Sequence, residues 1–246
     1  MDFDNMISGK SVALIGPALY LTDSGYGDEI DSNDVVIRLN RGIELVNKHS
    51  QDIGTRTDIL YSCLIEKPAN AGKLDIELMD DLGIKMIVAP PHSDFVGVAH
   101  QTKFHQLVNY SKISNIAKEI PVRIIDHVFH TELAKEVSCK PNTGFLAIFD
   151  LLRYKPKSLS IYGFSFYLDG FITGCKDGVE QEQGLTEEQF ALKCFNSKRH
   201  NQKNMWQYCK DNLLNNEIVK VDKFLNQILN LEELDREKYK TLPKPK

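Results

Sequence analysis

Small polar residues follow two glycine-containing turns and could hold a phosphate or a nucleoside. The first turn, Gly-Pro-Ala at 16–18, comes directly after the apolar run at 11–15. The second segment, Pro-Asn-Thr-Gly at 141–144, opens an apolar stretch that is expected to be a helix. A helix start presents free N–H groups and a partial positive charge, which suit a phosphate or a carboxylate. Both patterns also occur at ordinary strand and helix ends, so neither identifies a ligand alone.

Asn40 lies at the carboxyl end of a second expected strand, residues 34–39. Ligands of parallel sheets bind at such ends, and an amide can contact a base or a ribose hydroxyl. Asn40 could equally cap a turn. Arg38 is expected to pair with an acid such as Asp31, and the polar turn at 52–57 is expected to brace the chain rather than to bind ligand.

A third segment, Tyr-Gly-Phe at 162–164, ends the expected strand at 158–162. Its glycine would allow a nucleobase to lie close to the backbone, although an ordinary strand end has the same appearance. The chain thus has three turns that could meet at one edge of a sheet.

The pattern of apolar runs indicates an α/β fold. Short buried-type strands alternate with helical stretches, which predicts a mostly parallel, Rossmann-like sheet flanked by helices. The expected strands are 11–15, 34–39, 57–63, 85–89, 122–126, 158–162 and 217–221, and the expected helices are 102–118, 144–153, 187–214 with a break, and 224–231. No linker interrupts the chain, so we expect one domain over residues 1–246, with residues 1–10 and 235–246 frayed.

Composition excludes several classes of protein. A net charge of −4 argues against nucleic-acid binding. The five cysteines form no CxxC pair and no zinc spacing, which favours reduced thiols in a cytoplasmic protein. No leader and no apolar run of about 20 residues is found, so a membrane span is not expected. The basic C-terminal tail could touch the inner face of a membrane peripherally.

Two segments resemble the large and small motifs of the sialyltransferases, glycosyltransferase family 29. Residues 12–57 contain the Gly-Tyr-Gly loop, the Ile-Asp pair, the Arg-x-Asn end and the Gly-x-Arg-Thr turn, and residues 141–164 contain Pro-x-Thr-Gly and Tyr-Gly-Phe. The resemblance implies a single GT-A-type domain and an inverting mechanism. It also implies a CMP-sugar donor as co-substrate, with no required metal or other cofactor.

The resemblance also assigns residues to a site. The residues that it implies for the CMP site are Gly16, Pro17, Ala18, Asn40, Asn142, Thr143, Gly144, Tyr162, Gly163 and Phe164. The family has a catalytic histidine near the chain end, and His200 is the best match by position. With an ordinary pKa of about 6.5 it would suit deprotonation of an acceptor hydroxyl, while the alternative is an exposed histidine on a helix surface.

The chain departs from the family pattern at several positions. Pro17 replaces the usual asparagine, and Ser11 and Pro156 stand near the positions of the family's linking cysteines. The histidine of the third motif is missing, so Tyr167 or Lys176 could serve the leaving phosphate. These departures leave the donor open between sialic acid and the related eight-carbon acid Kdo.

The leading interpretation is an inverting glycosyltransferase that moves sialic acid or Kdo from CMP to a glycan or glycolipid hydroxyl, as in polysaccharide biosynthesis. An NAD(P)-dependent Rossmann enzyme is the first alternative, although GxGxxG and an acidic residue after the second strand are missing. A catalytically silent nucleotide-binding protein is the second. Oligomeric state is not predicted.

Overall fold

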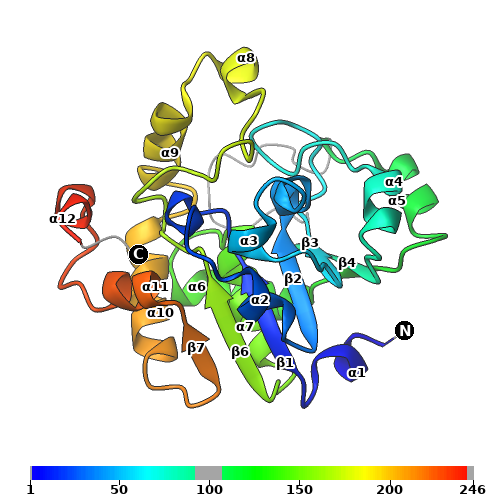
Figure 1. Ribbon diagram of the computed structural model, residues 1–246, viewed down its shortest axis with the longest axis horizontal. Coiled ribbons are helices and arrows are strands. Elements are labelled where there is room, and N and C mark those ends of the chain that lie inside the picture. Colours follow the sequence, from blue (N-terminus) through cyan, green and yellow to red (C-terminus); the bar gives the residue numbers. More distant parts are fainter. Residues whose placement is uncertain (1, 92–106, 243–246) are drawn as a thin grey trace.

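The computed structural model describes residues 2–91 and 107–242. Its centre is one seven-stranded sheet with the order β5-β4-β3-β2-β1-β6-β7, and each neighbouring pair of strands is parallel (Figure 1). The strands are β1 (Ser11–Ile15), β2 (Val35–Leu39), β3 (Ile59–Tyr61), β4 (Met86–Ala89), β5 (Val122–Ile124), β6 (Ser158–Tyr162) and β7 (Val219–Val221). The expected α/β sheet flanked by helices is confirmed.

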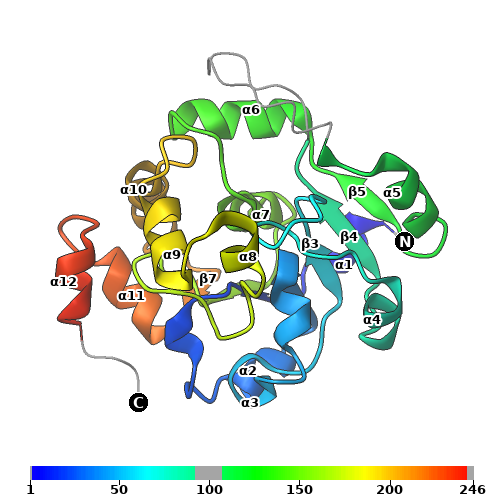
Figure 2. The ribbon, with the colours of Figure 1, turned by 90° about the horizontal axis from the view of Figure 1, so that it is seen from above.

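The described residues also form twelve α-helices, several of which cover the two faces of the sheet. They are α1 (Phe3–Ile7), α2 (Gly27–Asp31), α3 (Ser50–Ile53), α4 (Ile76–Asp81), α5 (Tyr110–Ile116), α6 (His127–Glu136), α7 (Thr143–Leu152), α8 (Val179–Gln183), α9 (Glu187–Phe195), α10 (Gln202–Leu213), α11 (Lys223–Leu229) and α12 (Arg236–Lys240). Figure 2 shows α6 and α7 on one face and α2 and α3 on the other. Helices α8 and α9 lie above the sheet in Figure 1.

The middle of the sheet brings the first glycine turn, Asn40 and the Tyr-Gly-Phe turn to one edge. Strand β1 pairs with β2 on one side and β6 on the other, so Ile15 stands beside both Arg38 and Tyr162. All five residues of β2 are buried, as expected for a strand covered on both faces. Because parallel strands end at the same edge, residues 16–18, Asn40 and residues 163–164 all begin at that edge.

Two predicted helices differ in their bounds. Residues 102–106 of the expected helix 102–118 lie outside the described residues, and α5 begins at Tyr110, where Asn109 caps it. The long stretch 187–214 divides into α9 and α10, as its polar pattern predicted. The break between them is the segment that carries His200.

Within the segments 1–10 and 235–246, which were expected to be frayed, the described residues form two short helices. Phe3 and Ile7 of α1 are buried, and Tyr239 of α12 is buried as well. Apolar side chains therefore anchor both short helices to the rest of the molecule. Across the described residues, no helix combines the length and the apolar character that crossing a membrane requires.

Candidate active site

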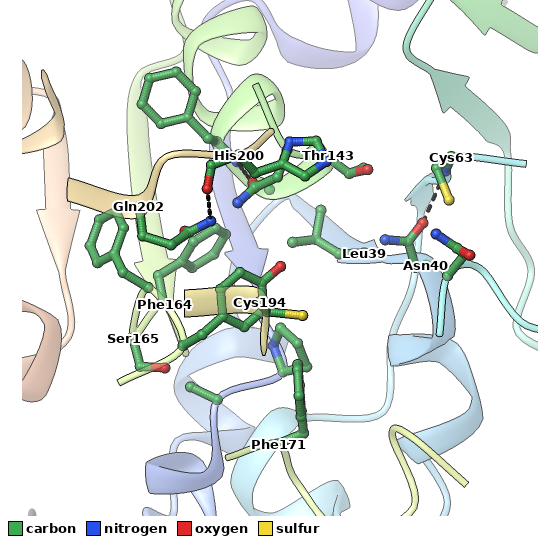
Figure 3. Close-up of a pocket in the computed structure, with 18 of the residues that line it drawn as sticks. Leu39, Asn40, Cys63, Thr143, Phe164, Ser165, Phe171, Cys194, His200 and Gln202 are labelled. Atoms are coloured by element: carbon green, nitrogen blue, oxygen red, sulfur yellow. Dashed lines mark hydrogen bonds between the residues drawn. The ribbon is translucent and has the colours of Figure 1, made fainter. Parts of the chain in front are cut away.

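A cavity of about 380 Å³ opens at the carboxyl edge of β1, β2 and β6. Figure 3 shows side chains from both halves of the chain pointing into it. The predicted site residues in its wall are Pro17, Ala18, Asn40, Asn142, Thr143, Gly144, Gly163, Phe164 and His200. The structure therefore brings together nine of the eleven residues that the sequence analysis assigns to the site.

Backbone contacts join the first glycine turn to the Tyr-Gly-Phe turn. The Gly16 N–H donates to the Tyr162 carbonyl at 2.7 Å, and the Ala18 N–H donates to the Gly163 carbonyl at 3.1 Å. A Cβ atom on Gly16 would collide with the Gly163 carbonyl, and Gly163 itself has φ +73°. Glycine is needed at both positions because the two segments touch there.

Gly16 and Tyr162 are the two predicted site residues that do not line the cavity. The Tyr162 hydroxyl donates to a Glu29 carboxylate oxygen at 2.7 Å, and its ring lies 5.4 Å from that of Tyr26. Tyr162 thus braces the α2 region. Gly16 packs against the backbone of Gly163.

Asn40 has the turn-holding role, one of the two that the sequence left open. Its backbone has φ 47°, and its Oδ1 accepts a hydrogen bond from the Cys63 N–H at 2.9 Å (Figure 3). This bond uses the amide oxygen to hold the chain after β3. The Nδ2 group remains as a donor in the cavity wall, where it could meet an oxygen of a ligand.

Arg38 has a different partner from the one expected. It is fully buried, and its guanidinium donates to the carbonyls of Ile53 and Gly54 rather than to a carboxylate. Asp31 instead accepts hydrogen bonds from Thr55 and from the Arg56 N–H. The expected bracing role of the polar turn is confirmed.

The start of α7 forms one wall of the cavity. The Asn142 side chain accepts a hydrogen bond from the Phe145 N–H at 2.9 Å and so caps the helix. The N–H groups of Thr143 and Gly144 have no acceptor within the helix and point out of its positive end. A Cβ atom on Gly144 would lie 2.8 Å from the ring of Phe164, so glycine lets the helix approach that ring.

A buried network that no sequence pattern predicted lies beneath the Tyr-Gly-Phe turn. Asp222 accepts hydrogen bonds from the Tyr20 hydroxyl at 2.7 Å and from the Gly163 N–H at 2.9 Å. The Tyr20 hydroxyl in turn accepts one from the Phe164 N–H at 3.0 Å. Asp222 also caps α11, and an acid between a strand and a helix is the signal that could have revealed it.

His200 lies in the turn between α9 and α10, not on a helix surface. Its Nδ1 is 2.7 Å from the Lys140 carbonyl oxygen. Because a carbonyl only accepts, Nδ1 carries the hydrogen, and the neutral ring has its lone pair on Nε2. The Gln202 side chain donates to the His200 carbonyl at 2.6 Å and holds the turn. Figure 3 shows His200 beside Thr143.

The surroundings of His200 change its acidity. Burial lowers the pKa of His200 from its ordinary value to about 4; the hydrogen bond to Lys140 raises it, while the charges of Arg199 and Lys140 lower it further. The expectation of an ordinary pKa is therefore corrected. At neutral pH the ring is uncharged and its Nε2 can accept a proton.

The charged side chains of the cavity wall share one sign. They belong to Arg41, Lys140, Lys176, Lys193 and Arg199, and no Asp or Glu is found among the wall residues that the structure describes. Tyr167 and Lys176, proposed from sequence for the leaving phosphate, both line the cavity. Burial raises the pKa of Tyr167, so its hydroxyl stays protonated and can donate. This wall suits an anionic ligand.

The described residues contain no cluster of potential metal ligands. Within residues 2–91 and 107–242, no three His, Cys, Asp or Glu side chains stand so that they could share a metal ion. A cavity at the carboxyl ends of parallel strands, with a helix start and a cationic wall, is typical of α/β proteins that bind anionic ligands.

The chain belongs to glycosyltransferase family 29, the sialyltransferases, whose family model matches residues 7–166. That range contains both segments that meet at the cavity and ends before His200. No curated protein matches the chain.

Solved sialyltransferases share the fold. A mammalian sialyltransferase in complex with Gal-beta-1-3GalNAc-ortho-nitrophenol is 16% identical, with a TM-score of 0.51 over 90% of this chain and 72% of that one. The sialyltransferase CstII from Campylobacter jejuni, in complex with the substrate analogue CMP-3FNeuAc, is 13% identical, with a TM-score of 0.50 over 88% of each chain. The predicted GT-A-type fold is confirmed.

Proposed function

We propose that this protein is an inverting glycosyltransferase that moves sialic acid, or the related acid Kdo, from a CMP donor to a hydroxyl of a glycan or glycolipid. The observation that carries the proposal is the convergence of the two family segments on one cavity, whose charged residues in the described part of the wall are all cations. Both donors carry a phosphate and a carboxylate, so their charges complement that wall. The CMP-3FNeuAc complex of the CstII structure supports the same class of donor.

The donor is proposed to lie between the first glycine turn and the start of α7. Asn40 would donate through Nδ2, and the free N–H groups of Thr143 and Gly144 would hold an oxyanion at the positive end of the helix. Phe164 would pack against the nucleoside. Pro17 lacks the amide side chain that is common in the family, so one contact to the donor is absent.

His200 is proposed as the general base. Its Nε2 would take the proton of the acceptor hydroxyl while that oxygen attacks the anomeric carbon from the face opposite to CMP. The bond to CMP breaks as the new bond forms, which inverts the configuration. Because the donor brings negative charge beside His200, its binding would raise the pKa of the ring above the value of the empty site and strengthen it as a base.

A donor screen tests the proposal. Purified protein is given CMP-sialic acid, CMP-Kdo, several UDP- and GDP-sugars and NAD, with a set of glycan acceptors, in the presence and absence of EDTA. We expect transfer from a CMP donor only, unaffected by EDTA. Binding of NAD without binding of CMP would favour the Rossmann alternative, and CMP binding without transfer or hydrolysis would favour a silent nucleotide-binding protein.

A further inference from the structure

Lys176 is a buried cation in the cavity wall, in the loop that leads from β6 to α8. Only 9% of its surface is exposed. Its Nζ lies 5.2 Å from the ring centre of Phe171 and 5.7 Å from that of Phe190. Figure 3 places Phe171 at the end of the pocket away from His200. Lys176 therefore brings a positive charge to the part of the cavity that the proposed base does not occupy.

The ammonium group of Lys176 has few protein partners. Its Nζ donates to the Ala69 carbonyl at 3.2 Å, and it forms no ion pair with a carboxylate in the described part of the chain. Arg41, another buried cation of this wall, is fully engaged: it pairs with Glu44 at 2.7 Å and donates to the Asp177 carbonyl at 2.6 Å. Lys176 thus keeps donor hydrogens that could bind a ligand, whereas those of Arg41 are largely used by protein acceptors.

A buried ammonium without a close counter-ion is costly to the fold, and Glu187 acts on Lys176 only as a charge beyond ion-pair distance. The ammonium has three donor hydrogens, and desolvation of its charge is offset only by a close anion or several hydrogen bonds. The two phenylalanine rings and one carbonyl supply part of that compensation. A ligand oxyanion in the cavity would supply the rest, and no carboxylate of the described wall competes for the position.

We infer that Lys176 is an anion-binding residue of the donor site, where its ammonium contacts an oxyanion of the CMP-sugar. The inference rests on the proposed function and adds to it a residue outside the two family segments. The oxyanion is either the phosphate of CMP or the carboxylate of the sugar acid. Both have the same chemistry toward Lys176, and binding measurements separate them.

The test compares wild type with the Lys176→Met, Lys176→Arg and Lys48→Met variants. Methionine keeps the length of the side chain and packs well against aromatic rings. Lys48 is exposed and lies beside Gly174, which belongs to the same loop as Lys176. Lys48→Met therefore makes an equal change of charge outside the cavity. Dissociation constants are measured for cytidine, CMP and CMP-sialic acid, and the melting temperature of each ligand-free protein is recorded.

We expect Lys176→Met to bind cytidine like wild type and to lose about tenfold or more in affinity for an anionic ligand. Loss for both CMP and CMP-sialic acid identifies the phosphate, and loss for CMP-sialic acid alone identifies the carboxylate. Lys176→Arg should keep most of the affinity, and Lys48→Met all of it. The ligand-free Lys176→Met protein should melt no lower than wild type, because a buried charge without a close counter-ion is gone.

Three results would overturn the inference. The first is equal affinity of Lys176→Met and wild type for all three ligands, and the second is a loss that is equal for cytidine and for the anionic ligands. The third is a clear fall in melting temperature, which would make Lys176 a structural residue. Wild type that binds neither CMP nor CMP-sialic acid would instead refute the proposed function itself.

Discussion

At the scale of single residues, the proposed chemistry depends on how backbone contacts orient two side chains. The Lys140 carbonyl fixes the hydrogen of His200 on Nδ1, and the Cys63 N–H occupies the oxygen of Asn40. Each contact leaves one defined atom for a ligand: a basic Nε2 in the first case and a donor Nδ2 in the second. Replacement of either side chain therefore has a specific expected effect.

Loss of His200 should remove turnover but not donor binding. His200→Ala is expected to lower kcat by about 10²–10⁴-fold, the usual contribution of a general base, with CMP affinity unchanged. Steady-state kinetics and CMP titration measure the two quantities. Wild-type turnover in the variant would eliminate His200 as the base.

The pH dependence should reflect the lowered pKa of His200. The neutral ring is the active form, so kcat/KM should stay level down to about pH 5 and fall only as the pH passes the pKa of about 4. The kcat profile should fall at a higher pH, because bound donor raises the pKa of the ring. NMR titration of the free protein, with His200→Asn to assign the signal, measures the value directly; a pKa near 6.5 would contradict the account.

The same lowered pKa makes a prediction for stability. The unfolded chain takes up a proton on this histidine near pH 6.5, while the folded protein does so only near pH 4. Protonation therefore favours unfolding as the pH falls through that window, and the contribution of the neutral ring to stability is retained above it. Denaturant titrations measure the effect: as the pH falls through this window, the free energy of unfolding of His200→Asn should decrease less than that of wild type.

The donor group of Asn40 can be removed without loss of its bond to the Cys63 N–H. Asn40→Asp keeps an oxygen for the Cys63 N–H and replaces the Nδ2 donor with a negative oxygen. CMP affinity should fall by about tenfold or more while the melting temperature changes little, because the bond that holds the chain is kept. Unchanged CMP affinity would place Asn40 outside the donor contacts.

At the scale of elements, a buried ion pair holds α7, whose first turn borders the cavity. Asp150 of α7 is fully buried and accepts hydrogen bonds from the Tyr61 hydroxyl of β3 at 2.8 Å and from Arg123 of β5 at 2.6 and 2.9 Å. One carboxylate thus ties the helix to two strands. The position of the Thr143 and Gly144 N–H groups follows from this attachment and from the Asn142 cap.

Removal of that carboxylate should destabilise the protein. Asp150→Ala leaves the Arg123 charge largely buried without its partner, and breaking such a pair costs about 3–5 kcal/mol. Urea unfolding measures the change, with Lys73→Ala, which removes half of an exposed pair, as a control that should match wild type. A loss below about 1 kcal/mol would show that the pair does not hold α7.

Sequence predicts some elements well and others poorly, for physical reasons. Strands β1, β2 and β6 are short apolar runs bounded by polar or glycine residues, and the structure has them within one residue of their predicted bounds. The polar stretch 187–214 could be predicted to break, but where the break would place His200 could not, because this depends on contacts with Lys140 and Gln202.

At the scale of the whole molecule, the site exists because β1 lies between β2 and β6 in one parallel sheet. This order brings residues 16–18 against Gly163, although nearly 150 positions separate them in the chain. The family segments and the sheet type could be predicted from sequence. Lys176 was proposed from sequence, but the cationic wall as a whole could not be, since Arg41, Lys193 and Arg199 come from segments that are distant in sequence.

The most direct test of the account is the location of CMP in a crystal structure of the complex. We predict that the nucleotide lies between the first glycine turn and the start of α7, with its phosphate within hydrogen-bond distance of the Thr143 or Gly144 N–H. Density for CMP at another position, or none at concentrations that saturate wild-type turnover, would contradict it.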